Sequence, residues 1–235
     1  MFTKTTELYD LIYSSIKDYR ADAAAVAALL SRVAPNARSL LDVACGTGEH
    51  ARHLSQEHGY VIQGLDIEPG FVELARAKVP SARFWQGDMA SFQLDDRFDA
   101  VVCLFSSIGY LLTTADVTRA LACFRRHLTR GGVVLVEPWL TPDVWKPGTV
   151  HFQSAKADGL SVTRMSHSGM VGHVSTIDFH YLVGTPEGIE HRTEHHELGL
   201  YSRTEMSECF ARAGFERVDY DEKGIMGRGL YIASA

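Results

Sequence analysis

The stretch Leu40-Leu41-Asp42-Val43-Ala44-Cys45-Gly46-Thr47-Gly48-Glu49-His50 decides how this chain is expected to fold. An apolar run ends in a small turn that contains two glycines, and a segment compatible with a helix follows. A strand that feeds such a turn brings backbone N–H groups and a helix N-terminus to its carboxyl end, where open α/β sheets bind their ligands. Because a side chain at Gly46 or Gly48 would keep a ligand away from the backbone, both glycines are expected at a binding site.

Three interpretations fit this turn. Together with Ala51 it matches G-x-G-x-x-A, a form of the dinucleotide fingerprint, and Asp66 lies 20 residues after Gly46. On that basis alone the chain would be an NAD-dependent oxidoreductase. The wider string from Asp42 to Gly48 resembles motif I of the class I S-adenosylmethionine (SAM) methyltransferases. A glycine turn that binds no ligand is the third alternative.

The composition indicates a globular chain of moderate size. With 235 residues, 46% of them hydrophobic, it has room for one α/β domain and a small subdomain. A net charge of −6 does not indicate binding to nucleic acid, and no apolar run is long enough to span a membrane. The polar residues around Lys4 predict no secretory signal. Four widely spaced cysteines without a C-x-x-C pair are typical of reduced, mostly buried thiols in a cytoplasmic protein.

Aromatic residues mark the N-terminal segment from Glu7 to Asp18. Tyr9 and Tyr13 are four residues apart, so on a helix they share a face. That face either packs onto the core or forms a flap that closes over a bound cofactor, and the pattern fits both alternatives equally well.

Strands and helices then alternate as far as residue 136. The expected strands cover residues 39–43, 60–65, 82–86, 98–105 and 133–136, and the expected helices cover 21–33, 49–58, 70–78 and 115–128. We expect Arg130-Gly131-Gly132 to stop the last of these helices. This alternation predicts a parallel, doubly wound sheet.

The pattern changes after the fifth strand. Residues 161–166, 175–183 and 190–201 are rich in β-formers, which predicts an antiparallel sheet inserted at residues 146–201. The glycines expected to separate these strands are Gly169, Gly172, Gly184 and Gly188. Ser202 and Glu205 form a capping box for a helix that ends near Gly214. Residues 215–221 and 230–233 would form an antiparallel hairpin. The expected fold is therefore a Rossmann-like α/β core of residues 1–145 and 202–235, whose seven-stranded sheet has its last strand antiparallel.

Several polar side chains follow the expected strands. Asp66 is placed to accept both ribose hydroxyls of an adenosine ligand, and it is also a candidate helix N-cap because Pro69 follows. Asp88 is placed to accept the adenine amino group while Met89 packs on the ring. His191, His195 and His196 lack the spacing of a metal site, since on a strand His196 points opposite to the other two. We expect no bound metal and a solvated or interface strand there.

The chain as a whole resembles the bacterial N,N-dimethyltransferases of nucleotide-linked amino sugars, the desosamine and mycaminose type, within the class I SAM methyltransferases. The resemblance spans almost the whole chain. It rests on the glycine motif and on these strings: Glu7-Leu8-Tyr9-Asp10, Gly87-Asp88-Met89, Phe105-Ser106-Ser107-Ile108-Gly109, Gly131-Gly132-Val133-Val134-Leu135-Val136-Glu137-Pro138-Trp139, Ser166-His167-Ser168 and Gly227-Arg228-Gly229-Leu230.

The resemblance implies SAM as cofactor, with S-adenosylhomocysteine as product, and a small-molecule acceptor, which would be a dTDP-linked 3-amino-deoxysugar. It also implies a homodimer, for which the inserted sheet would be the interface, the acceptor cover or both. The cofactor-binding residues would be Tyr13, Asp42, Ala44, Gly46, Gly48, Asp66, Ile67, Asp88, Met89, Leu104 and Phe105. The acceptor would meet Tyr9, Tyr19, Ser107, Trp139 and Arg228, with Tyr110 and His167 as the catalytic candidates.

Two departures from this resemblance leave the acceptor open. Tyr110 stands where the sugar enzymes carry histidine, and Leu140 replaces a second aromatic after Trp139. Another small-molecule N- or O-methyltransferase, including one that acts on amino acids, is therefore an alternative. A non-catalytic SAM-binding scaffold is another.

For the chemistry we expect direct in-line displacement at the SAM methyl. An amine acceptor must be neutral to attack, but a tyrosine, with a reference pKa of about 10, is a weak base near neutrality. Tyr110 is therefore expected to orient the acceptor while water takes the proton. Arg228 would meet a phosphate of the acceptor, since its planar fork suits phosphate contacts, or else form a surface salt bridge.

Overall fold

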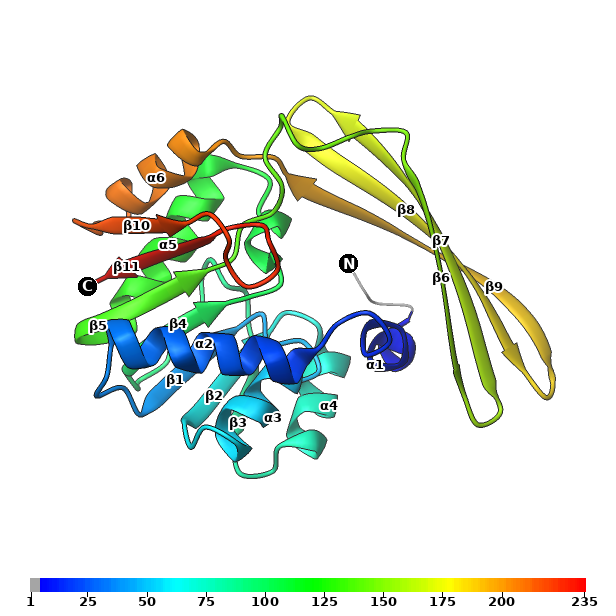
Figure 1. Ribbon diagram of the computed structural model, residues 1–235, viewed down its shortest axis with the longest axis horizontal. Coiled ribbons are helices and arrows are strands. Elements are labelled where there is room, and N and C mark those ends of the chain that lie inside the picture. Colours follow the sequence, from blue (N-terminus) through cyan, green and yellow to red (C-terminus); the bar gives the residue numbers. More distant parts are fainter. Residues whose placement is uncertain (1–4) are drawn as a thin grey trace.

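The computed structural model describes residues 5–235, which form two sheets and the helices around them (Figure 1). The prediction about a secretory signal rests on Lys4 and its neighbours, which lie outside the described residues. The seven-stranded sheet has the order β10-β11-β5-β4-β1-β2-β3, and its strands are β1 (Ser39–Val43), β2 (Val61–Asp66), β3 (Arg83–Gln86), β4 (Phe98–Cys103), β5 (Leu128–Val136), β10 (Val218–Asp221) and β11 (Leu230–Ser234). Because β11 runs antiparallel to β5, the predicted fold class is confirmed.

Helices cover both faces of this sheet. One face carries α2 (Tyr19–Val33), α3 (Glu49–Gln56) and α4 (Pro69–Lys78), and the other carries α5 (Thr114–Arg126) and α6 (Arg203–Arg212). The strands alternate accordingly: Leu40 packs toward α2–α4, whereas Leu41 and Val43 pack toward α5 and α6. All three side chains are fully buried, as expected for a strand covered on both faces.

The junction between α5 and β5 differs from the prediction. The helix ends at Arg126, with His127 as its C-cap, and β5 begins at Leu128, which pairs with Phe98 of β4. Gly131 and Gly132 therefore lie inside β5, where the pairing register shifts, and they do not stop the helix. Gly131 has a φ of +75°, which suits a bulge. The predicted capping box of Ser202 and Glu205 is present at the start of α6.

The second sheet has four antiparallel strands: β6 (Val150–Ala157), β7 (Leu160–Val171), β8 (Val174–Thr185) and β9 (Gly188–Gly199). All of them lie within the predicted insertion, but the prediction of three strands was wrong because it omitted β6. That strand is largely exposed, so it lacks the apolar alternation that marks a half-buried strand. Gly169 and Gly184 lie inside β7 and β8 and do not separate strands.

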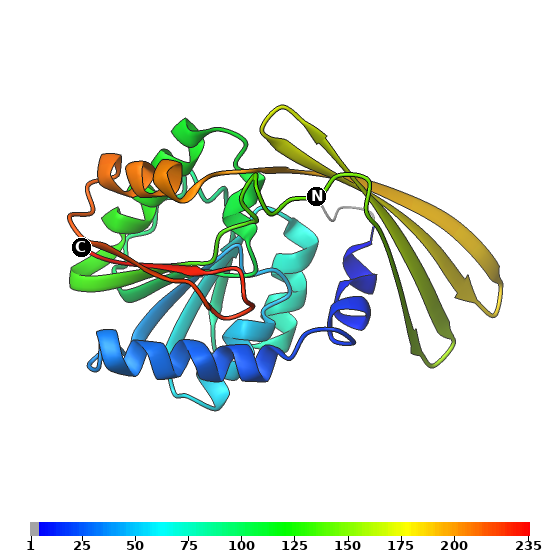
Figure 2. The same cartoon turned by 45° about the horizontal axis from the view of Figure 1, so that its top comes forward.

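The N-terminal elements η1 (Thr6–Leu8) and α1 (Tyr9–Tyr13) lie in the angle between the two sheets (Figures 1 and 2). Leu8, Ile12 and Tyr13 pack with Phe179 and Tyr181 of β8 in one cluster, so α1 is attached to the second sheet by apolar contacts. The segment thus combines features of both predicted alternatives: it packs, but onto the second sheet, and it leaves aromatic side chains facing the space between the sheets.

The four cysteines are buried and none forms a disulfide. Within residues 5–235 there is no helix with the length and apolar character needed to cross a membrane.

Candidate active site

A cavity of about 790 Å³ opens at the carboxyl ends of the parallel strands, between the core and the second sheet. This is the position at which doubly wound sheets bind ligands. The core contributes its strand-end turns, α1 contributes Tyr9 and Tyr13, and the concave face of the second sheet contributes residues of all four strands. Thirteen of the predicted site residues line it: Tyr9, Tyr13, Ala44, Gly46, Asp66, Ile67, Asp88, Met89, Phe105, Ser107, Tyr110, Trp139 and Arg228.

The glycine turn forms one wall of the cavity, and its two glycines have different roles. Gly46 has a φ of +55°, and a β-carbon built there would meet nothing within 4 Å, so its backbone is open to the cavity. Gly48 has a φ of +80° and lies at the N-cap of α3, where a β-carbon would sit 3.0 Å from Cβ of Ala75 in α4. Gly48 therefore lets α3 and α4 approach each other, and its predicted contact with a ligand stays a prediction.

Asp66 faces the cavity at the end of β2. Its Oδ2 accepts a hydrogen bond from the Gly46 amide at 2.9 Å, and its Oδ1 accepts one from the Glu68 amide at 2.9 Å. Burial raises the pKa of Asp66, while these amide donors lower it. The N-cap alternative was wrong, since Glu68 caps α4 by accepting from the Gly70 amide. Asp66 instead joins the glycine turn to the β2–α4 loop.

Two predicted cofactor residues, Asp42 and Leu104, lie behind the cavity wall. Both are fully buried and neither lines the cavity. Burial and the nearby Asp66 charge raise the pKa of Asp42 to about 8, so its carboxyl group is protonated at neutral pH. Their side chains therefore lie beneath the turn, and their predicted part in cofactor binding stays a prediction.

Apolar side chains form the floor and cover of the cavity near Asp66. Tyr9 packs edge-on against Phe71 of α4, with ring centroids 4.9 Å apart, and Tyr13 packs edge-on against Phe105 at 5.4 Å. Met89 and Ile67 lie on the same side. Asp88 also lines the cavity, where its Oδ1 accepts from the Ala90 amide at 2.8 Å. This half of the cavity has flat apolar surfaces beside the carboxylates of Asp66 and Asp88.

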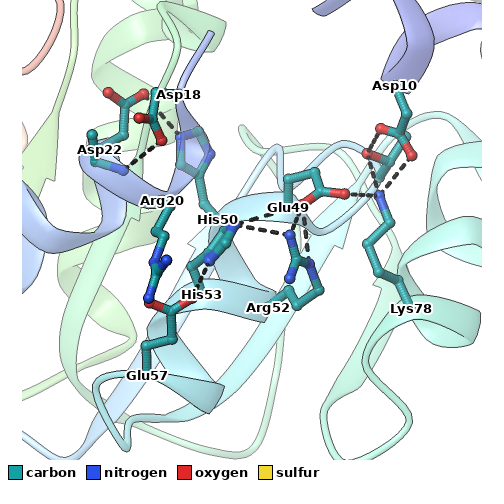
Figure 3. A network of polar contacts seen from close by, with 12 residues as sticks. Asp10, Asp18, Arg20, Asp22, Glu49, His50, Arg52, His53, Glu57 and Lys78 are labelled. Atoms are coloured by element: carbon teal, nitrogen blue, oxygen red, sulfur yellow. Dashed lines mark hydrogen bonds and ion pairs between the residues drawn. The ribbon is translucent and has the colours of Figure 1, made fainter. Parts of the chain in front are cut away.

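A polar network fastens α1 to the glycine turn (Figure 3). Lys78 at the end of α4 donates from Nζ to Oδ2 of Asp10 at 2.6 Å and pairs with Oε1 of Glu49 at 2.7 Å. Thr47, between the two glycines, donates to Asp10 and accepts from Lys78. Because Asp10 follows Tyr9 directly, this cluster, the Lys78 latch, holds the aromatic cover over the cavity.

The opposite half of the cavity is built around a strained backbone. Phe105 and Ser106 have φ values of 52° and 61°, in the left-handed region that non-glycine residues rarely adopt. Oε2 of the buried Glu137 accepts from the Phe105 amide at 2.7 Å, and the Ser106 hydroxyl donates to the Pro138 carbonyl at 2.7 Å. Strain of this kind persists only where the surroundings fix it, and it is common at active sites.

Arg228 lies against this strained segment. Its Nη1 donates to the Ser106 hydroxyl at 3.0 Å, and its guanidinium lies 4.9 Å from the centre of a Trp139 ring. Burial lowers its pKa, and among residues 5–235 no carboxylate lies within ion-pair distance. The surface salt bridge proposed as an alternative for Arg228 is therefore absent from the described structure.

Two predicted acceptor residues lie outside the cavity. His167 is exposed, because alternation along β7 turns it to the outer face while Ser166 and Ser168 face inward. Tyr19 packs at the start of α2 against the His50 ring, at 4.9 Å. The geometry therefore gives no support to their predicted contacts with the acceptor, which stay predictions.

Sequence reasoning missed the contributions of the second sheet. The most important is His196, fully buried on β9, whose Nδ1 lies 2.7 Å from the Tyr110 hydroxyl. Its opposite orientation to His191 and His195 was predicted, but which face of the strand meets the cavity was not. Arg164 and Lys17 were also missed, and both are already engaged: Arg164 donates to Tyr13 and Gln153, and Lys17 pairs with Asp22. Residues 5–235 contain no cluster of side chains able to hold a metal ion.

Comparison with known proteins gives matches along the whole chain. Residues 40–132 match a family model described as a methyltransferase domain. The chain is 44% identical over 96% of its length to dTDP-3-amino-3,6-dideoxy-α-D-glucopyranose N,N-dimethyltransferase of Streptomyces fradiae, and covers 88% of that protein. It is 42% identical over 96% of its length to the dTDP-3-amino-3,4,6-trideoxy-α-D-glucopyranose N,N-dimethyltransferase of Streptomyces venezuelae, and covers 95% of it.

Two solved structures are similar to this chain in both sequence and fold. The crystal structure of DesVI from Streptomyces venezuelae is 41% identical, with a TM-score of 0.92 and 98% of each chain covered. SAM-bound CalS10, an amino pentose methyltransferase from Micromonospora echinaspora, is 36% identical, with a TM-score of 0.84 and 94% and 92% of the two chains covered. This chain belongs to the SAM-dependent methyltransferase family. Of the interpretations of the glycine turn, motif I of these methyltransferases is the one confirmed.

The cavity of this methyltransferase fits SAM on its own chemistry. The open backbone at Gly46 leaves room for a ligand to approach the turn. The Asp66 carboxylate retains acceptor capacity beyond its two amide donors, which suits ribose hydroxyls. Phe71, Met89 and Ile67 offer apolar surfaces for a purine.

Proposed function

We propose that this methyltransferase transfers methyl groups to the amine of a nucleotide-linked, dTDP-type 3-amino-deoxysugar. Arg228 is the observation that carries the proposal. Its guanidinium is mostly removed from water, stacks on Trp139 and faces the cavity. In the described structure it forms no direct ion pair, and the charge of Glu137 acts on it only from a distance. A buried cation needs a counter-charge, and a planar guanidinium matches a phosphate by paired hydrogen bonds.

The relatives support the same acceptor. The Streptomyces fradiae and Streptomyces venezuelae proteins are named as dimethyltransferases of dTDP-3-amino sugars, and a Saccharopolyspora spinosa protein, 35% identical over 96% of this chain, is named for a dTDP-4-amino sugar. The shared element of these names is a dTDP-linked amine, which a cavity with an unpaired cation beside an aromatic ring would accommodate.

The residues that line the cavity come from two parts of the chain, and we assign a different ligand to each part. We propose that residues 1–145 and 202–235 bind SAM, through Tyr13, Ala44, Gly46, Asp66, Ile67, Asp88, Met89 and Phe105, and that residues 146–201 cover the acceptor. Bound SAM supplies a methyl group already activated on a sulfonium. Tyr9, Ser107 and Trp139 line the acceptor's path, and α1 excludes water above it. Holding an amine in line with a methyl group contributes on the order of 7 kcal/mol toward such a barrier.

We further propose a cytoplasmic homodimer. Free, buried thiols at all four cysteines suit a reducing compartment. The outer face of the second sheet exposes Met165, Leu182 and Ile189, at 48%, 51% and 79%, and apolar groups gathered on one sheet are typical of an interface between subunits. Size-exclusion chromatography with light scattering tests the dimer, which an Ile189→Glu, Leu182→Glu double variant should dissociate.

Mass spectrometry of acceptors incubated with protein and SAM tests the proposed acceptor. The panel holds dTDP-linked 3-amino sugars, the corresponding free sugars and simple amino acids. We expect one or two methyl increments on the dTDP-linked sugar, and we expect Arg228→Met to raise its KM about tenfold or more. Arg203→Met is the matched control, since Arg203 pairs with Glu222 on the surface. Methylation of a free amine in preference to the dTDP-linked sugar would overturn the proposed acceptor.

A further inference from the structure

Tyr110 and His196 form a hydrogen-bonded pair that joins the two halves of the molecule. Tyr110 belongs to η2 (Ser107–Tyr110), directly after β4 of the core, and His196 belongs to β9 of the second sheet. The Tyr110 hydroxyl lies 2.7 Å from Nδ1 of His196, and both side chains line the cavity. The pair exists only when the second sheet is seated on the core.

Burial sets the protonation of this pair. It lowers the pKa of His196, whose imidazole is therefore neutral near pH 7, and it raises the pKa of Tyr110, which stays a phenol. A phenol beside a neutral imidazole donates its proton to Nδ1, which assigns the remaining ring proton of His196 to Nε2. The phenol oxygen then keeps its lone pairs available on the cavity side.

Glu194 stands behind the imidazole. Its Oε2 lies 3.7 Å from Nε2 of His196 and accepts hydrogen bonds from Thr5 at 2.8 Å and Tyr181 at 3.2 Å. At this distance the carboxylate stabilises an imidazolium by its charge, which is one role of the acidic member in other hydroxyl–histidine–carboxylate arrangements.

We propose that Tyr110 and His196 relay a proton away from the acceptor amine, an inference that rests on the proposed function. When the acceptor nitrogen gains a methyl group it becomes a positively charged ammonium. It must lose one N–H proton to become a neutral amine again. The N–H proton passes to the Tyr110 oxygen as the Tyr110 hydroxyl proton passes to Nδ1 of His196. The N–H electron pair becomes the nitrogen lone pair, His196 becomes an imidazolium beside Glu194, and water in the cavity later takes its proton.

Loss of the relay should slow the second of two methyl transfers more than the first. After one methyl group has been added, the secondary ammonium cannot attack again until it has lost a proton. Without the relay this proton has to leave through water inside a cavity that α1 and the second sheet cover. The structure therefore assigns to His196 a part in the number of methyl groups transferred.

Other titratable groups surround the pair and have to be held constant in any test. Four other elements contribute them: Tyr9 and Tyr13 lie on α1, Asp66 on β2, Arg164 on β7 and Tyr181 on β8. Glu194 and His195 lie on β9 itself.

The experiment measures monomethyl and dimethyl products over time between pH 6.5 and 9 for wild type, Tyr110→Phe, His196→Gln and the double variant. We expect each single variant to accumulate monomethyl product at neutral pH, with the second transfer slowed about 10- to 100-fold. The double variant should be no slower than either single variant, because the relay acts as a unit. Raising the pH should restore the second transfer, since more of the amine is then free.

His195→Gln is the matched control, since His195 is the neighbouring residue on β9 but points to the exposed outer face. Calorimetric binding of S-adenosylhomocysteine reports folding and should be the same in every variant. Unchanged product ratios and pH profiles in both Tyr110→Phe and His196→Gln would overturn the relay. If the wild type methylates a different amine, or adds one methyl group only, the proposed acceptor or the second transfer is wrong, and the pH profile of the observed transfer tests the relay by itself.

Discussion

The two sheets of this methyltransferase are stabilised in different ways. The seven-stranded sheet is covered by helices on both faces, and its two clusters contain most of the buried apolar residues. The four-stranded sheet has one buried face, on which eight buried side chains from η1, α1, the start of α2 and the strands form a single cluster, while its outer face is exposed. The core is therefore expected to be stable by itself, whereas the second sheet depends on the N-terminal segment.

The two sheets also contribute different groups to the cavity. The core provides the turn, the carboxylate and the apolar floor that a SAM-binding site needs, and these lie close together in the sequence. The second sheet provides acceptor-side groups that face the cavity because the sheet curves over it. Changes in the core should thus affect stability and cofactor binding, and changes in the second sheet should affect the acceptor.

The largest expected effect compares two buried aromatic residues. Phe124→Ala in the core should lower the free energy of unfolding by about 3–5 kcal/mol. Tyr181→Ala on β8, equally buried, should instead raise hydrogen exchange in β7–β9 and α1 while the core transition keeps its midpoint. Chemical denaturation combined with hydrogen exchange measures both. A single transition shifted equally by both substitutions would show that the two sheets unfold as one unit.

A second prediction separates the two glycines of the turn. Gly46→Ala places a methyl group in open cavity space and should weaken SAM binding about 100-fold, with a stability loss of about 1–2 kcal/mol from its positive φ. Gly48→Ala meets Ala75 and should mainly lower the midpoint of thermal unfolding. Calorimetry and thermal denaturation distinguish them, and equal losses of SAM affinity without loss of stability would contradict the assigned roles.

The pH dependence of stability should reveal Asp42. Its folded-state pKa of about 8 lies above the unfolded value of about 3.9, so between these two pH values the folded state binds more protons than the unfolded state. Stability from this group is complete below pH 4 and falls by up to about 1.4 kcal/mol per pH unit as the pH rises to 8. Asp42→Asn should remove this slope, as denaturation curves at pH 5, 6, 7 and 8 will show. An identical slope in the variant would mean that Asp42 ionises normally.

The smallest expected effect concerns the Lys78 latch. Lys78→Met frees Asp10 and loosens α1, so the KM for SAM should rise about three- to tenfold with kcat little changed, and hydrogen exchange should increase over residues 5–18. Arg20→Met is the control, because its exposed ion pair with Glu57 joins α2 to α3 and does not touch α1. Equal effects of the two substitutions would rule out a specific role for the latch.

Local chemistry allowed much of the core to be predicted from the sequence. The bounds of β1, the capping box of α6, the antiparallel hairpin and the position of Asp66 at the end of β2 depend on side chains within a few residues of one another. Apolar runs, glycine turns and caps specify such features because their interactions are short in sequence.

Contacts between distant segments decided the rest. The sequence showed that His196 and His195 point in opposite directions, but only the seating of the second sheet on η2 placed His196 against Tyr110 and left His167 outside. Gly48 is required because Ala75, 27 residues away along the chain, packs against it. Trp139 and Phe105 lie beside the Arg228 guanidinium and shield it from water. A strand pattern fixes which side chains share a face, whereas packing against another part of the chain fixes what that face meets.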